Sequence, residues 1–190
     1  MLIEDFIKSQ ISLSNDELET LDNYYYKKKL LKNETLLCEG EICGFVSFIC
    51  KGALIYYKLL ENGNEVTTDF AFEGEWAADN FSRITNTPSQ LYIKAIEDSE
   101  LIIINSKNLE LLFGNMPAFE KLGRILSEQA LIRVTQLSVD LQALTAKERY
   151  LKLLNKYPDI FNKVQLHHIA NYLGIAPKSL SRIRKEISAR

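Results

Sequence analysis

The C-terminal part of the chain contains, at residues 164–187, the stretch VQLHHIANYLGIAPKSLSRIRKEI. Its apolar residues recur at three- and four-residue spacing, as on one face of a helix, in two sets: Leu166, Ile169, Ala170 and Leu173, then Leu180, Ile183 and Ile187. Gly174 follows the first set where the chain must turn sharply, and glycine readily takes the left-handed backbone of such a turn. Pro177 suits the first turn of a second helix. The stretch therefore predicts a helix-turn-helix, whose second helix, from about Pro177 to Ser188, enters the major groove of DNA.

The outward face of this second helix distinguishes DNA binding from an ordinary helical hairpin. When Leu180, Ile183 and Ile187 turn inward, the residues that point away are Ala176, Pro177, Lys178, Ser181, Arg182 and Lys185. None of these is acidic, and they can approach bases and phosphates. Salt-sensitive attraction to the DNA backbone is expected from the basic residues Lys147, Arg149, Lys178, Arg184 and Lys185. The pattern favours DNA binding over a hairpin without nucleic acid.

Charge is divided unevenly along the chain. The net charge of −2 does not by itself indicate a nucleic-acid-binding protein. Residues 145–190, however, contain ten Lys or Arg and three Asp or Glu, a balance of +7, whereas the other 144 residues have a balance of −9. A basic segment joined to an acidic body is typical of a DNA-binding domain attached to another domain.

Length and composition indicate a globular protein of one large or two small domains. The chain has 190 residues, of which 46% are hydrophobic and 25% charged. It has no run of 18 apolar residues, and residues 1–6 lack the basic and then apolar pattern of a secretion signal. We therefore expect no membrane partner and a cytoplasmic location.

Three cysteines, Cys38, Cys43 and Cys50, lie close together in the sequence. An odd number cannot pair completely, which argues against a disulfide framework. Three thiolates could bind zinc or an iron–sulfur cluster, but no fourth ligand is evident nearby, and small buried thiols are the favoured interpretation. Whether they have a redox role is left open. The two histidines, His167 and His168, are expected on the surface rather than as metal ligands, so no metal site is predicted.

The region from about residue 30 to 104 has the pattern of strands. Short runs rich in β-branched and aromatic residues are separated by turn signals at Gly40, Gly52, Gly63 and Gly74; the runs are residues 44–50, 53–59, 65–72, 92–96 and 101–104. This spacing predicts a β-roll or jelly roll rather than a parallel sheet. Capping boxes at Ser14 with Glu17 and at Thr145 with Glu148 predict the starts of two helices.

A long helix is predicted from about Ala118 to Leu141, with two apolar stripes. The first comprises Phe119, Leu122, Leu126, Ala130, Val134, Leu137 and Leu141, and the second comprises Ile125, Ile132 and Val139. A surface helix of a monomer needs only one apolar face. We therefore expect the first stripe to pack on the chain's own domain and the second to form a dimer seam, although a helix buried within one domain is an alternative.

The order of these parts resembles the Crp/Fnr family of bacterial transcription regulators over essentially the whole chain. The resemblance is carried by Leu173-Gly174-Ile175, by Ser179-Leu180-Ser181-Arg182-Ile183, and by the Gly-turn strands with Asp98-Ser99-Glu100-Leu101. It implies an α+β fold: residues 1–115 as a cyclic-nucleotide-binding-like β-roll, 116–143 as a dimerisation helix and 144–190 as a DNA-binding domain. Because the sequence ends at Arg190, we expect this helix-turn-helix domain to lack a full wing.

The resemblance also implies partners and site residues. The partners are double-stranded promoter DNA, a second copy of the chain and RNA polymerase. Lys178 and Arg182 correspond to recognition-helix positions that read bases, and Arg suits guanine. Gln165 and His167 correspond to positions near the DNA backbone, and the remaining predicted DNA contacts are Ser179, Ser181 and Lys185.

The predicted ligand pocket departs from the cyclic-nucleotide binders of the family. In those proteins a Gly-Glu-Leu segment holds the ribose and an Arg-Ser/Thr pair holds the cyclic phosphate; here the corresponding stretches are Ala78-Asp79-Asn80 and Ser89-Gln90. Ser89 replaces the arginine, so the charged grip on phosphate is missing. Residues 131–133 also lack the small hydroxyl side chains that read adenine. We therefore expect no usual response to cyclic AMP, no cofactor, and an effector that the sequence does not identify.

Together these patterns predict a DNA-binding transcriptional regulator without catalytic activity. One alternative is a small-molecule-binding β-roll whose helical tail contacts another protein. A cupin-type enzyme is disfavoured, because cupins need clustered His and carboxylate metal ligands and the β region contains no histidine.

Overall fold

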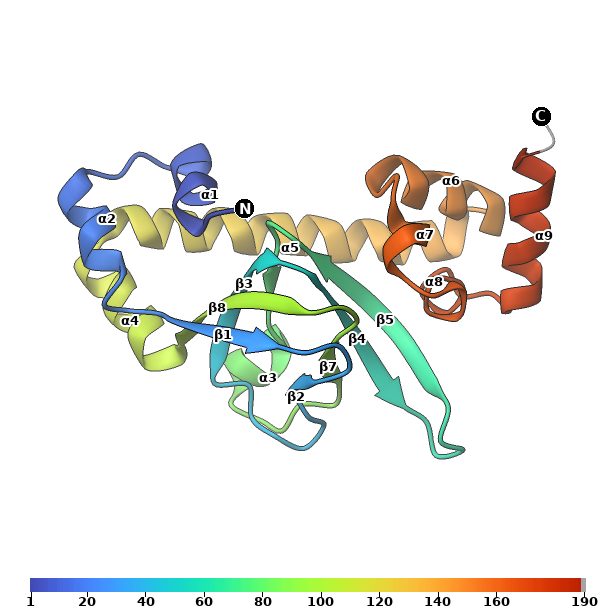
Figure 1. Cartoon of the computed structure of the whole chain (residues 1–190), viewed down its shortest axis with the longest axis horizontal. Coiled ribbons are helices and arrows are strands. Elements are labelled where there is room, and N and C mark those ends of the chain that lie inside the picture. Colours follow the sequence, from blue (N-terminus) through green and yellow to red (C-terminus); the bar gives the residue numbers. More distant parts are fainter. Residues whose placement is uncertain (189–190) are drawn as a thin grey trace. The chain divides into compact units, whose positions relative to one another are not determined.

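The computed structural model describes residues 1–188, which form a mixed α+β chain of two compact units (Figure 1). The first unit comprises residues 1–56 and 70–129, and the second comprises residues 57–69 and those from 130 onward. The tip of one β-hairpin therefore belongs with the C-terminal helices. Ala189 and Arg190, the last residues of the predicted DNA-binding domain, lie outside the described residues.

The strands of the described residues form two four-stranded sheets, with the orders β1-β8-β3-β6 and β2-β7-β4-β5, and the five predicted runs correspond to β3, β4, β5, β7 and β8. The strands are β1 (Tyr26–Leu30), β2 (Thr35–Leu37), β3 (Phe45–Lys51), β4 (Ala53–Leu59), β5 (Glu65–Phe72), β6 (Trp76–Ala77), β7 (Tyr92–Ala95) and β8 (Ser99–Asn105). Strand β8 pairs antiparallel with both β1 and β3. The predicted roll, rather than a parallel sheet, is confirmed.

The alternation of β8 explains how the roll is packed. Leu101 and Ile103 belong to one buried cluster, together with residues of both sheets, whereas Ile102 and Ile104 belong to a second cluster with the helices. Successive side chains of a strand point to opposite faces, so β8 contributes to both clusters at once. At Gly52, between β3 and β4, φ is +102° and an added Cβ would lie 2.2 Å from Ser99 Oγ, so this turn requires glycine.

Helices complete the first unit. They are α1 (Ile3–Gln10), α2 (Asn15–Leu21), α3 (Asn80–Thr85), α4 (Ser106–Asn115) and the first half of α5 (Pro117–Ala143). The predicted capping box at Ser14 and Glu17 is present at the start of α2. Phe119 and Leu122 of α5 are buried in the second cluster, as expected for the first stripe of the long helix.

The second unit contains the tip of the β4–β5 hairpin, the second half of α5, and α6 (Ala146–Lys156), α7 (Ile160–Lys163), α8 (Leu166–Tyr172) and α9 (Pro177–Ser188). The capping box at Thr145 and Glu148 starts α6 as predicted. The first stripe does not stay covered along α5, because Val134 is 65% exposed and Leu141 is also exposed. No helix among residues 1–188 is long and apolar enough to cross a membrane.

Candidate nucleic-acid interface and roll interior

The turn between α8 and α9 has the geometry that the sequence predicts. Gly174 has φ +66°, and its N–H donates to the carbonyl of Asn171 at 2.9 Å. The N–H of Ile175 donates to the carbonyl of Ala170 at 3.0 Å. These two bonds form a Schellman motif, which satisfies carbonyls at the end of α8 and turns the chain into α9.

Helix α9 presents a basic face to solvent. Leu180 and Ile183 are buried, whereas Lys178, Arg182 and Lys185 are exposed. The structure thus separates the two faces as the spacing predicts. Ser179 and Ser181 are half-buried, and Ser181 Oγ donates to the carbonyl of Pro177 at 3.1 Å within the helix.

Two contacts flank α9 and limit its rotation about its own axis. Glu186 forms an ion pair with Lys147 of α6 at 3.8 Å. The guanidinium of Arg184 lies 4.2 Å from the ring centroid of Phe161 in α7. Because these residues flank the buried face on its two sides, they help to direct the face with Lys178 and Arg182 outward.

Arg149, which is predicted to attract the DNA backbone, is hydrogen-bonded within the protein. Its Nε and Nη2 donate to the carbonyl of Leu173 at 3.1 and 2.9 Å, and Nη1 donates to the carbonyl of Leu144 at 2.6 Å. The side chain thereby joins the end of α8 to the segment before α6, and it supplies donors that the last carbonyls of a helix need.

The two histidines of α8 differ in burial. Gln165 and His167 are exposed at the start of the helix, as expected for residues near DNA. His168 is only 5% exposed and its Nδ1 lies 2.7 Å from Thr67 Oγ1, so its predicted surface position is wrong. The spacing of α8 did not show that a second element covers this face. Within residues 1–188 no group of three metal-ligating side chains is found.

The predicted ligand residues are only partly brought together. Asp79 and Ser89 are buried and bonded to each other, with Ser89 Oγ donating to Asp79 Oδ2 at 2.7 Å. Asp79 Oδ1 also accepts from the N–H of Ser82 at 3.2 Å and so caps α3. Asn80 is exposed and accepts from Arg83 Nη2 at 3.1 Å, while Gln90 is exposed. The carboxylate and the hydroxyl are therefore already bonded within the chain.

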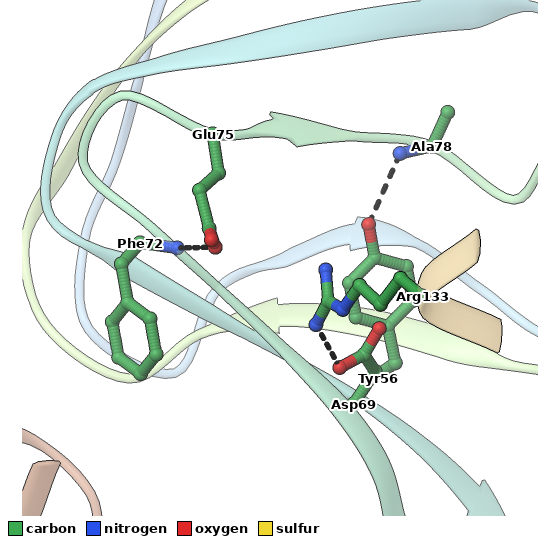
Figure 2. Close-up of polar contacts among 6 residues, drawn as sticks. All are labelled: Tyr56, Asp69, Phe72, Glu75, Ala78 and Arg133. Atoms are coloured by element: carbon green, nitrogen blue, oxygen red, sulfur yellow. Dashed lines mark hydrogen bonds and ion pairs between the residues drawn. The ribbon is translucent and has the colours of Figure 1, made fainter. Parts of the chain in front are cut away.

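Tyr56 is a residue of the roll interior that the sequence did not single out. It is buried, and its hydroxyl accepts from the backbone N–H of Ala78 at 3.1 Å (Figure 2). Ala78 precedes the predicted ligand residue Asp79, so a backbone donor in this segment is already bonded to the chain's own side chain. In the sequence, Tyr56 lies in the apolar run of residues 53–59, which predicts that the side chain is buried but not that it contacts Ala78.

Helix α5 exposes apolar residues along its second half. Of the predicted dimer seam, Ile132 is 68% exposed and Val139 is exposed, whereas Ile125 is partly buried against the helical cluster of the first unit. Leu131 is exposed as well. A contiguous set of large exposed apolar residues on one helix is unusual for a surface that stays in water.

Comparisons with known proteins agree with this architecture. Residues 27–116 match the family described as the cyclic nucleotide-binding domain. The chain is 25% identical to the fumarate and nitrate reduction regulatory protein of Escherichia coli over an alignment that covers 90% of this chain and 73% of that protein. FixK2 from Bradyrhizobium japonicum has a similar structure, with a TM-score of 0.75, 20% identity, and coverage of 87% of this chain and 85% of that one. A structure described as a regulator of the Crp/Fnr family from Eubacterium rectale has a TM-score of 0.67, 17% identity, and coverage of 93% and 84%.

A cyclic-nucleotide-binding-type roll followed by a long helix and an exposed basic helix-turn-helix defines a DNA-binding transcriptional regulator. In sequence and architecture the chain is similar to the Crp/Fnr-type regulators.

Proposed function

We propose that this regulator acts as a homodimer, without catalytic activity, on promoter DNA in the cytoplasm, with RNA polymerase as a further partner. The observation that carries the proposal is the face of α9, where Lys178, Arg182 and Lys185 are exposed while Leu180 and Ile183 are buried. Each subunit inserts α9 into a major groove, and the two half-sites lie about one helical turn (~34 Å) apart. Residues 1–115, 116–143 and 144–190 serve as sensor, dimerisation helix and DNA-binding domain.

The side chains of the interface divide into base-reading and backbone-contacting groups. Arg182 and Lys178 project from the exposed face of α9, where Arg can bond guanine and Lys either guanine or phosphate. Lys185 contributes backbone attraction. The remaining proposed contacts are Ser179, Ser181, Gln165 and His167. Of these, Gln165 and His167 are exposed at the start of α8.

We also propose that the roll does not bind cyclic AMP in the way usual for the family. Asp79 and Ser89 bond each other, and Tyr56 occupies the N–H of Ala78. A cyclic phosphate placed beside Asp79 would meet a buried carboxylate, without the arginine that compensates an anion. Isothermal titration with cyclic AMP is expected to show no binding up to about millimolar concentration. Any binding would then be weaker than a Kd of about 1 mM, which corresponds to a binding free energy of about −4 kcal/mol. Micromolar binding that Asp79→Ala abolishes would contradict this part of the proposal.

Selection of bound sequences from a random duplex pool tests the DNA-binding assignments. The wild-type chain is expected to select a site with two inverted half-sites. In the Arg182→Ala variant we expect one base position in each half-site to lose its preference, at a cost of about 1–3 kcal/mol.

Lys185→Ala provides the comparison for Arg182→Ala. It should weaken all duplexes alike and reduce the salt slope by about one. If Arg182→Ala also weakened specific and random DNA equally, its base-reading role would be wrong. A wild-type chain that ignores duplex DNA even at low salt would favour the alternative, a roll whose helical tail contacts protein.

A further inference from the structure

Alternate residues of strand β5, in its part within the second unit, contact helices of that unit. Glu65 contacts α8 through its backbone carbonyl, which accepts from Asn171 Nδ2 at 2.9 Å. Thr67 contacts α8 through its side chain, and Asp69 forms an ion pair with Arg133 of α5 (Figure 2). We call these three residues, Glu65, Thr67 and Asp69, the β5 strap. Each of these contacts joins two residues of the second unit.

The contact between Thr67 and His168 is the most buried of the three. Thr67 is 1% exposed and His168 is 5% exposed, and their polar atoms are 2.7 Å apart. A buried hydrogen-bonding atom that loses its partner retains the full cost of its desolvation. This bond therefore favours the arrangement in which α8 stays against β5.

The strap holds the face of α8 that points away from α9. His168 and Asn171 are three residues apart and share one face of α8. The residues that belong to the helix-turn-helix core, Ile169 and Ala170, project from the opposite side and are fully buried. Helix α8 is thus held on two sides, and α9 is attached to it through the Gly174 turn.

We propose that the β5 strap positions the helix-turn-helix for DNA binding, so that residues of a β-hairpin control the affinity for DNA without touching it. This inference rests on the DNA-binding function of α9. With the strap bonded, Lys178, Arg182 and Lys185 are exposed, so the strapped form is the form that binds DNA. Release of the strap loosens α8 and lowers the affinity.

Thr67→Val tests the central contact, because valine keeps the shape of threonine and removes its hydroxyl. We expect amide hydrogen exchange in α8 to accelerate about five- to tenfold, and affinity for the selected DNA site to fall by a similar factor. Thr67→Ser keeps the hydroxyl and should restore both values. Thr35→Val is the matched control, since it makes the same substitution at an exposed residue of strand β2, in the first unit. Exchange in β3 and β8 should not change in any variant, which distinguishes release of the strap from general destabilisation.

The ion pair provides an independent test of the same strap. Asp69→Arg and Arg133→Asp should each weaken DNA binding, and the double variant, which restores opposite charges, should recover most of the affinity.

Two results would contradict the proposed role of the β5 strap. One is unchanged amide hydrogen exchange in α8 of the Thr67→Val variant, and the other is faster exchange without loss of DNA affinity. A wild-type chain that binds no duplex would instead overturn the proposed function, and the exchange experiment, which needs no DNA, separates these two failures.

Discussion

Arg149 is a basic residue beside the DNA-binding motif whose hydrogen bonds stabilise the fold. Its three donated bonds reach the carbonyls of Leu144 and Leu173, and the residue is only partly exposed. A hydrogen bond that involves a charged group contributes about 1.5–3 kcal/mol, and a carbonyl left without a partner adds a desolvation cost.

We therefore expect Arg149→Met to lower the free energy of unfolding by about 2–3 kcal/mol, measured by urea denaturation. Methionine keeps the aliphatic length of the side chain and removes the guanidinium. In the folded variant the salt dependence of DNA binding should stay that of the wild type. If stability stayed unchanged and the salt slope fell by about one, Arg149 would be a phosphate contact after all.

At the scale of the element, the turn between α8 and α9 depends on one backbone conformation. Gly174 has φ +66°, while an added Cβ would find only Leu141 Cδ2, at 3.7 Å, an ordinary contact. The cost of a side chain here is therefore the left-handed backbone rather than a clash. Gly174→Ala should destabilise the protein by about 1–2 kcal/mol in thermal unfolding.

Gly114→Ala is the control, for which we expect a change in stability of the opposite sign. Gly114 lies in α4, and an added Cβ would meet nothing within 4 Å. Alanine there should stabilise by about 0.4–1 kcal/mol, because it restricts the unfolded chain. Destabilisation by both substitutions to the same extent would remove the special role of the turn at Gly174.

Elements with a strong local signal could be predicted from the sequence. The helix-turn-helix follows from the spacing of Leu166 to Ile187 and from Gly174, and the main strands follow from runs separated by glycine turns. Helix α3 could not be predicted in this way, because its six residues are too few for a repeating pattern, and its two large apolar residues, Phe81 and Ile84, are both exposed. It is stabilised by side-chain bonds such as that of Asp79 to the N–H of Ser82.

The candidate sites could likewise be predicted only where a local sequence pattern determines them. The exposed face of α9 depends on helix periodicity, and the sequence contains that periodicity. The bond between Thr67 and His168 joins residues 101 positions apart, so no local pattern could indicate it. For the same reason the sequence could identify Asp79 and Ser89 as ligand residues, but not that they bond each other.

At the scale of the whole molecule, the exposed apolar residues of α5 favour association with a second subunit. Ile132 and Val139 are seven residues apart and exposed, and Leu131, Val134 and Leu141 of the same helix are exposed as well. Heptad spacing places Ile132 and Val139 on one seam, along which a second α5 can pack. In a two-fold dimer a single substitution changes both sides of the interface, so its effect is doubled.

Ile132→Glu should therefore dissociate the dimer, because it places two carboxylates in an apolar seam. We expect the dimer dissociation constant, measured by sedimentation equilibrium, to rise about 100-fold or more. The two half-sites of an operator would then be bound separately, and affinity for the full site should fall toward that for a half-site. Ile84→Glu is the matched control, since Ile84 is 72% exposed on α3, close to the 68% of Ile132, and the same substitution there should leave the dimer intact. Equal effects of the two variants would indicate a general loss of stability, and a wild-type chain that sediments as a single subunit would show that α5 is not the dimer seam.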